Sequence, residues 1–287
     1  MILKLMSKNN ILLLLIALII SGCASFNAQY KEEVQEEFPV NLEIQKSFYL
    51  IGDVGKSPIG GKSDGLLALE SYLKTQTTDK DHLIFLGDNI YPTGMPSKES
   101  DFRPIAENHL NAQIDVAKTF NGSTVFIPGN HDWYNEGLDN VEREKKYIEK
   151  ALDNKNIWEP KVGCPINSID ISEEIQLIIV DSQWYLAKWD QHPTINDDCD
   201  QIKTRDQFFL EIEGEFKKNQ DKTIVFALHH PLYTNGIHGG QYAAIKHLYP
   251  SQSAIPVPIL GSLATQIRTS GGVSAQDKQN KRYQEMV

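Results

Sequence analysis

The sequence is short of basic side chains. Its 287 residues include 28 Lys and Arg against 38 Asp and Glu, which leaves a formal net charge of -10. This balance argues against nucleic acids and anionic lipid surfaces as general partners, because both carry negative charge themselves. An acidic protein that acts on an anionic substrate needs a local source of positive charge, and bound metal ions are often the largest charges in such a site.

Long apolar runs are scarce too. One uninterrupted run, residues 11–20, follows Lys4 and Lys8 and is too short to cross a bilayer as a helix, which is typical of a secretory signal peptide. The Ile-Ser-Gly-Cys sequence that ends at Cys23 resembles the bacterial lipoprotein cleavage box, in which the Cys becomes the lipidated first residue. The alternative is a plain secretory signal with a chance Cys. Either signal sends the domain out of the cytoplasm, and we expect a lipid anchor at Cys23 on the periplasmic or outer-membrane face of the cell envelope.

The sequence indicates three segments. Residues 1–22 form the lipoprotein signal peptide, and residues 23–46, which are acidic and have little apolar content, form a flexible tether. Residues 47–287 form one domain, and neither an internal repeat nor a low-complexity tract interrupts it.

Cysteine is rare, and only Cys164 and Cys199 remain besides Cys23. In an oxidising compartment two such thiols suit a disulfide, although two independent thiols are the alternative. We favour the disulfide, which would fix two loops and take no part in chemistry.

From residue 47 onward, short apolar runs alternate with amphipathic helical patterns. The runs rich in β-branched and aromatic residues are 48–51, 82–86, 124–127, 175–180 and 223–228. The helical patterns are 66–74, 107–120, 138–152 and 204–218. This alternation predicts a layered α/β fold in which helices flank central β-sheets.

Four polar clusters follow these strands, where ligands gather in α/β proteins. They are Gly-Asp-Val-Gly at residues 52–55, Gly-Asp-Asn-Ile-Tyr at 87–91, Gly-Asn-His-Asp at 129–132, and His-His-Pro at 229–231 with His238 beyond. Singly, each has an ordinary explanation, such as a helix cap or a polar turn. Together they offer oxygen and nitrogen ligands that suit Fe, Mn or Zn, and they predict a metal site at the carboxyl ends of the strands.

In this order the four clusters resemble the calcineurin-like metallophosphoesterases, over about residues 47–240. Tyr91, three residues after Asp88, is typical of the purple acid phosphatase-like branch, and the surroundings of residues 229–240 resemble its bacterial lipoprotein members. The resemblance implies a phosphatase or phosphodiesterase with a dinuclear metal centre, acting on a phosphorylated small molecule or another phosphoester.

The resemblance also implies roles for individual residues. Asp53, Asp88 and Tyr91 would hold the first metal, Asp88 would bridge both metals, and Asn130 and His229 would hold the second. Two such metals clamp the attacking and leaving oxygens and lower the pKa of a bound water to about 7, so that hydroxide is available at neutral pH.

Two further histidines and the cysteine pair follow from the same resemblance. His131 would stand beside the phosphate as electrostatic partner or proton donor, and His238 would lie near the leaving group. Relatives carry Cys where Cys164 and Cys199 fall here, which also implies their disulfide.

One motif of the family is missing. The Gly-His-x-His that supplies one His to each metal does not occur, and residues 276–282 look like the approach to its strand. We therefore expect a C-terminally incomplete member with low activity in the 287-residue form. Some bacterial relatives continue into a membrane β-barrel domain, a continuation that the resemblance leaves open. The alternative function is an envelope lipoprotein that keeps the fold as a binding or structural module.

Overall fold

The computed structural model describes residues 44–76, 78–189, 191–233, 248–249, 260–263 and 275–287. The contacts divide the chain into two compact units, one running from Pro39 to His230 and one that contains the described residues from Pro231 onward. All six strands of the described residues belong to the first of these units. The predicted signal peptide, Cys23 and His238 lie outside the described residues.

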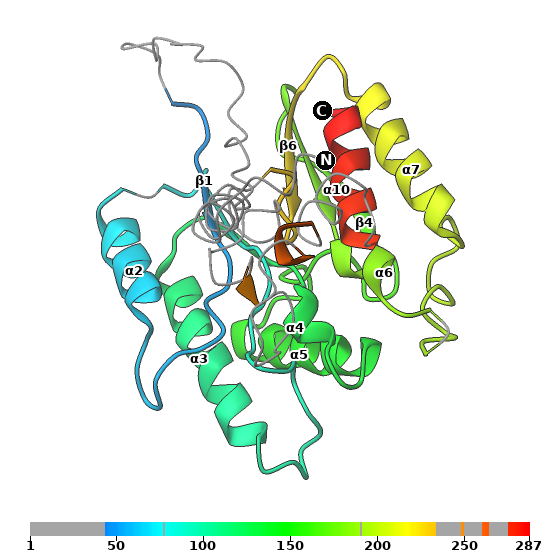
Figure 1. Ribbon diagram of the computed structural model, residues 1–287. Coiled ribbons are helices and arrows are strands. Elements are labelled where there is room, and N and C mark those ends of the chain that lie inside the picture. Colours follow the sequence, from blue (N-terminus) through cyan, green and yellow to red (C-terminus); the bar gives the residue numbers. More distant parts are fainter. Residues whose placement is uncertain (1–43, 77, 190, 234–247, 250–259, 264–274) are drawn as a thin grey trace, which may run out of the picture. The chain divides into compact units, whose positions relative to one another are not determined.

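The first sheet is parallel throughout and brings three strand ends to one edge. Its order is β1 (Phe48–Ile51), β2 (His82–Phe85) and β3 (Ser123–Phe126). Ile51 pairs with Phe85, and Phe85 pairs with Phe126, so the chain leaves all three strands at the same level (Figure 1). The polar clusters after these strands therefore begin side by side.

The second sheet is mixed and consists of β4 (Ile166–Asp170), β5 (Ile175–Val180) and β6 (Thr223–Leu228). β4 is antiparallel to β5, whereas β5 and β6 are parallel, with Val180 opposite Leu228. The sequence analysis did not predict β4. β4 lies at the edge of the sheet, so its residues are half-buried or exposed, and three of the five are polar.

The two sheets pack face to face through alternating strand residues. Ile84 and Ile127 from the first sheet meet Leu177, Ile179 and Ala227 from the second in one buried cluster. Side chains at the intervening positions point outward, as strand geometry requires. Burying each such aliphatic side chain contributes roughly 1.5–3 kcal/mol, so this cluster is a main source of stability.

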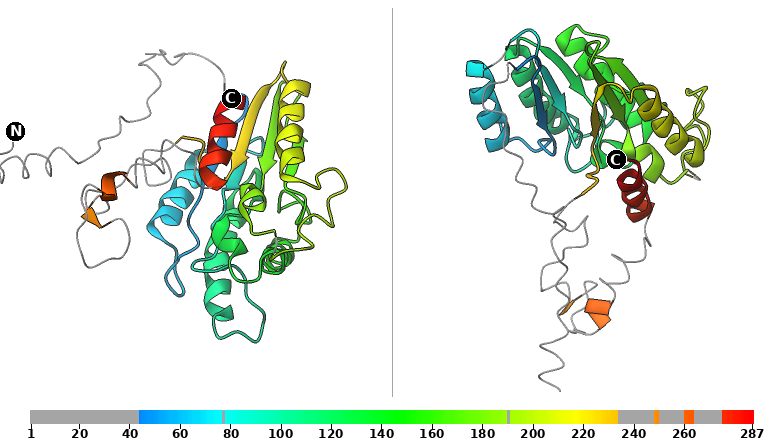
Figure 2. Two further views of the ribbon diagram at one scale, coloured as in Figure 1. Left: turned by 45° about the vertical axis from the view of Figure 1, so that its right-hand side comes forward. Right: turned by 90° about the horizontal axis from the view of Figure 1, so that it is seen from above.

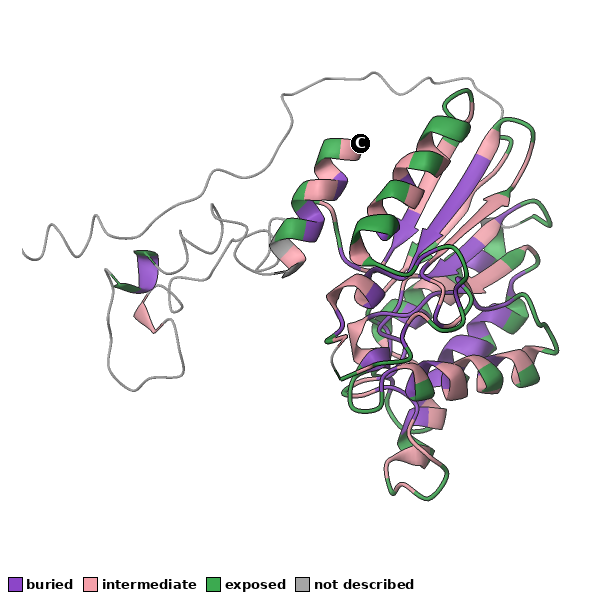
Figure 3. Cartoon of the chain, turned by 90° about the vertical axis from the view of Figure 1, so that its right-hand side faces the viewer, coloured by how far each residue is buried: buried purple, intermediate pink, exposed green. Residues whose placement is uncertain are grey.

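Helices cover the outer faces of both sheets, which confirms the predicted layered α/β fold. α2 (Asp64–Gln76) and α3 (Arg103–Thr119) lie against the first sheet, where Tyr49 packs on Tyr72 and Phe120. α7 (Arg205–Lys218) lies against the second, with Phe216 on Phe226 at 5.1 Å between ring centroids. The right-hand view of Figure 2 shows these layers from above, and Figure 3 shows exposed outer helix faces beside strands that are buried or half-buried.

The helix boundaries follow local signals. α5 (Leu138–Leu152) has the bounds that the sequence predicts, and α7 begins after Thr204, whose hydroxyl accepts from Gln207 N at 3.2 Å. α3 begins earlier than predicted, because Pro104 occupies its first turn. The short helices α4 (Asn130–Trp133) and α6 (Ser182–Leu186) were not predicted.

The described residues after Pro231 include one long helix. It is α10 (Ala275–Met286), which contains residues 276–282, the segment that the sequence analysis interpreted as the approach to a missing strand. Gln279 donates to the Tyr283 hydroxyl one turn further on, at 3.1 Å. Within the described ranges, no helix combines the length and the apolar character that crossing a membrane requires.

Candidate metal centre

Two aspartates at the ends of neighbouring strands adopt the left-handed backbone conformation. Asp53 follows β1 with a φ of 59°, and Asp88 follows β2 with a φ of 54°. This region is uncommon for residues other than Gly, but Asp tolerates it better than most. Backbone hydrogen bonds from Asp53 N to Gly87 O (3.0 Å) and from Gly55 N to Asp88 O (3.1 Å) join the two loops.

Glycine at position 129 lets the third loop approach the second. A Cβ on Gly129 would overlap the backbone nitrogen and Oδ1 of Asp88 and would lie 2.9 Å from Nδ1 of His229. The close approach of backbone to side chain is therefore possible only without a side chain here. It brings Asn130 and His131, at the start of α4, next to Asp88.

A cluster of oxygens forms one half of the site. The Tyr91 hydroxyl lies 2.6 Å from Asp53 Oδ1 and 2.7 Å from Asp88 Oδ2. A single hydroxyl hydrogen cannot serve two carboxylates at once, and no Lys or Arg of the described residues forms an ion pair with either. Burial and these two carboxylates raise the pKa of Tyr91 above its usual value. A bound cation would supply the missing positive charge.

His229 forms the other half of the site. Its Nδ1 lies 2.8 Å from the carbonyl oxygen of Leu86, which can only accept, so in the neutral ring Nδ1 carries the hydrogen. The lone pair on Nε2 then points at Asn130 Oδ1 (3.1 Å) and Asp88 Oδ1 (3.4 Å). Three acceptors facing one another indicate the place of a cation, and a metal-binding His typically donates its other nitrogen to a carbonyl in this way.

These residues fit a metal site. Ligand atoms of Asp53, Asp88 and His229 all lie within 4.8 Å of one another. The two oxygens of Asp88 point to different halves, Oδ2 to Tyr91 and Oδ1 to His229. A set of hard oxygens with one imidazole suits Fe, Mn or Zn.

His131 lies beside this group and remains accessible, with 27% of its side chain exposed. Its Nδ1 is 2.7 Å from the carbonyl oxygen of Pro92, and its ring lies between Tyr91 (4.3 Å) and Tyr134 (4.6 Å). Its Nε2 stands 4.0 Å from Asp88 Oδ2. The ring is thus oriented by a carbonyl on one side and offers its other nitrogen to the site.

Asp132 holds two of the loops together from behind. It is fully buried, and its carboxylate accepts hydrogen bonds from Gly129 N (2.7 Å), Ile90 N (3.1 Å) and Asn89 Nδ2 (3.3 Å). Burial and the nearby charge of Asp88 raise its pKa to about 8, although the three N–H donors act in the opposite direction. Asp132 therefore fixes the positions of the loops that carry Asp88 and Asn130.

The sequence analysis assigned no role to Asp132 or Tyr134. Nδ2 of Asn130 donates to the Tyr134 hydroxyl at 2.6 Å, and this turns Oδ1 of Asn130 toward His229. The spacing of four residues, with both on one face of a helical turn, was the available signal. This spacing indicates a contact only if residues 130–133 are helical, which the sequence did not predict.

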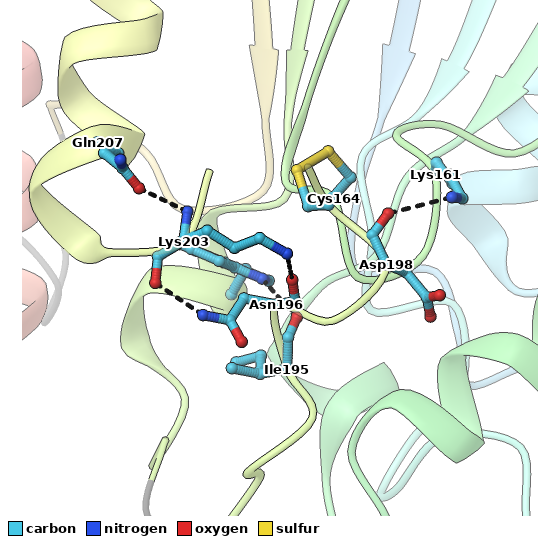
Figure 4. Close-up of a disulfide and its surroundings, with 9 residues drawn as sticks. Lys161, Cys164, Ile195, Asn196, Asp198, Lys203 and Gln207 are labelled. Carbon is cyan, nitrogen blue, oxygen red and sulfur yellow. Dashed lines mark hydrogen bonds between the residues drawn. A yellow bond between two sulfur atoms is a disulfide. The ribbon is translucent and has the colours of Figure 1, made fainter. Parts of the chain in front are cut away.

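The structure joins Cys164 and Cys199 by a disulfide (Figure 4), and neither cysteine belongs to the candidate metal-ligand group. Nζ of Lys161 donates to the carbonyl oxygen of Asp198 at 3.1 Å, so a hydrogen bond reinforces the covalent link. The bridge connects the loop before β4 with the loop before α7.

Comparison with known proteins agrees with this geometry. The calcineurin-like phosphoesterase family model matches residues 46–254, and the chain belongs to this family of metal-dependent phosphoester hydrolases. Purple acid phosphatase 7 of Arabidopsis thaliana is 25% identical over 250 residues, which span 84% of this chain and 69% of that protein. The chain is thus similar to a purple acid phosphatase at a distance.

Proposed function

We propose that the chain hydrolyses phosphate esters at a centre of two metal ions. Asp53, Asp88 and Tyr91 would hold one ion, Asn130 and His229 would hold the other, and Asp88 would bridge them. The observation that carries the proposal is the orientation of Asp88, whose Oδ2 lies 2.7 Å from the Tyr91 hydroxyl while its Oδ1 lies 3.4 Å from His229 Nε2. One carboxylate thereby faces two separate groups of ligands.

The protein residues prepare the site for an anionic substrate. When bound, the metal ions supply the positive charge that an acidic chain lacks and lower the pKa of a water at the site. His131 is held by Pro92 so that its Nε2 faces the site, where the doubly protonated ring would donate a hydrogen to a phosphate oxygen or to the departing alkoxide. Because the candidate metal ligands lie together, the alternative function, a binding or structural module without catalytic activity, is not favoured.

Further parts of the proposal rest on the sequence. His238 would assist the leaving group, and Cys23 would carry a lipid that anchors the protein in the cell envelope. The resemblance to bacterial lipoproteins of this family and the apolar run at residues 11–20 support the second point.

The test compares isosteric variants of the metal-loaded protein. Asp53→Asn and Asp88→Asn each replace one charged ligand oxygen with an amide and keep a residue type that tolerates positive φ. Asp221→Asn, at an exposed position outside the site, makes the same change of charge. Each variant is loaded with Fe, Mn or Zn, its metal content is determined, and its hydrolysis of p-nitrophenyl phosphate is measured.

We expect the two site variants to lose bound metal and activity, while Asp221→Asn keeps both. Wild-type activity in Asp88→Asn, or hydrolysis that persists after complete removal of metal, would contradict the proposal.

A further inference from the structure

Most of the charged side chains in a cleft between two helices are positive. α3 and α5 pack against each other and border a cavity of about 610 Å³. Its charged side chains, which define the basic cleft, are Lys98, Arg103, Glu107, Arg143, Lys146 and Lys150. Five basic groups face one carboxylate here, in a chain whose formal net charge is -10. A random distribution of the charges would favour acidic side chains.

Helical geometry explains why the basic groups converge. Arg143, Lys146 and Lys150 are spaced by three and four residues, so they lie on one face of α5. The acidic residues Glu142 and Glu149 lie off this face and both pair with Lys145, and Glu142 also reaches Lys146. These two acidic residues of α5 therefore lie beside the cleft. Positive and negative side chains usually alternate along a solvent-exposed helix, but the face of α5 that lines the cleft carries basic residues.

Two of the cations are held in position by the protein. Arg103 contacts Glu107 at 2.7 Å and the Pro96 carbonyl oxygen at 2.7 Å. Arg143 donates to the Met95 carbonyl oxygen at 2.9 Å and to Glu136 at 2.8 Å. These contacts fix the two guanidinium groups before any ligand arrives, which lowers the entropic cost of binding.

The other cations are less compensated. Lys98 and Lys150 are exposed and form no ion pair among the described residues, and Lys146 has only an exposed pair with Glu142 at 3.2 Å. Exposed pairs of this kind contribute little to stability. The cleft therefore keeps positive charge available for an external anion.

The extent of the cleft indicates an anion with several charged groups. Residues 143 and 150 are seven positions apart on α5, which corresponds to about 10 Å along a helix. A single phosphate or sulfate is too small to reach cations at both ends. Tyr147 and Ala151 add an apolar part to the wall, and Arg103 lies 5.8 Å from the centre of the Tyr147 ring.

We propose that the basic cleft binds a small organic polyanion, a compound with several phosphate or sulfate groups on a compact scaffold such as a sugar ring. The charged groups would bind the arginines and lysines, and the scaffold would pack on Tyr147. The cleft contains none of the candidate metal ligands, so this proposal does not depend on the proposed hydrolase function.

The probe for the test is sucrose octasulfate, which contains no phosphoester that the enzyme could hydrolyse. Its binding to the metal-loaded full chain is measured by isothermal titration calorimetry in low salt. The cleft variant is Lys146→Glu/Lys150→Glu. The matched control is Lys80→Glu/Lys217→Glu, which makes the same change of net charge at exposed lysines outside the cleft.

We expect the cleft variant to bind at least about tenfold more weakly, because two of the five cations become anions, and the control to change less than about threefold. Hydrolysis of p-nitrophenyl phosphate should stay at the wild-type rate in both, which separates the cleft from the metal centre and excludes misfolding. The proposal would be overturned if both double variants bound the probe equally weakly, or if the cleft variant bound it as tightly as wild type. It would also be overturned if inorganic sulfate displaced the probe when both supplied the same concentration of sulfate groups.

Discussion

At the scale of single residues, the backbone of Asp53 and Asp88 limits what can replace them. Both have positive φ, a conformation that costs most residues about 1 kcal/mol or more. An alanine at either position would combine the loss of a ligand with this backbone strain. Asparagine keeps the conformation accessible, so a defect in the Asn variants can be assigned to the ligand itself.

His131→Ala should slow turnover far more than it lowers metal content. His131 does not belong to the group whose ligand atoms lie within 4.8 Å of one another, and its Nε2 faces the site from 4.0 Å. Loss of a general acid typically reduces the rate by about 10²–10⁴-fold. The measurement is kcat together with metal content, and His192→Ala serves as the control. A parallel fall of metal occupancy and rate would show that His131 is a ligand.

Asp181 should make the protein less stable as the pH rises. Burial raises its pKa to about 7, although Trp184 N, the Trp133 indole and Gln183 N donate to it and act in the opposite direction. Between about pH 4 and pH 7 the folded state therefore holds a proton that the unfolded state has released, and the free energy of unfolding falls with increasing pH.

Urea unfolding at pH 4.5 and pH 7 checks this expectation. The wild-type protein should lose more stability over that interval than Asp181→Asn, which cannot ionise. An equal pH dependence of the two proteins would mean that Asp181 is already ionised at pH 4.5.

At the scale of elements, the sequence predicts those parts that local patterns determine. The strands at 48–51 and 175–180 and the helix at 138–152 appear with the predicted bounds, because apolar runs and amphipathic spacing are strong signals. β4 escaped prediction because its pairing with β5 is a tertiary contact, and α4 because four residues are too few for periodicity. In the candidate site, the order of the motifs predicted the candidate ligands, but the hydrogen bonds that orient them depend on carbonyls such as Leu86 O, which no side-chain pattern reveals.

The loops joined by Cys164 and Cys199 should depend on their disulfide for stability. The two cysteines are 35 residues apart in sequence, and closing a loop of that length constrains the unfolded chain by roughly 3–4 kcal/mol in the chain-entropy model. Cys164→Ser/Cys199→Ser should therefore lower the free energy of unfolding by about this amount. Metal content should change little, because the bridge is outside the ligand group.

Chemical denaturation of the oxidised wild-type protein and the double serine variant measures the difference. Alkylation of both Cys164 and Cys199 in the wild-type protein without reductant would show instead that the bridge does not form.

At the scale of the whole molecule, the negative charge of Asp88 should lower stability in the absence of metal and raise it when metal is bound. Without metal, Asp53 and Asp88 approach the same hydroxyl and repel each other, so Asp88→Asn should be at least as stable as metal-free wild type. With metal at about a hundred times its Kd, wild type should gain roughly 2.7 kcal/mol, and the variant should gain much less. Thermal unfolding of both proteins with and without metal measures this reversal of order. A variant that is less stable under both conditions would assign a structural role to the Asp88 charge.

The contact between His229 and Leu86 also has a consequence for the time at which the site forms. These residues are 143 positions apart, and Asn130 and His229 are 99 apart. During synthesis, Asp53 and Asp88 therefore emerge long before the imidazole that completes their surroundings. Among the proposed ligands, those of the early chain offer only oxygen atoms, which suit weakly held ions such as Mg²⁺. If the proposed ligands hold a metal, nitrogen ligation, and with it selection of a transition metal, would have to wait until β6 has joined the second sheet, and acquisition of the metal would be a late step of maturation.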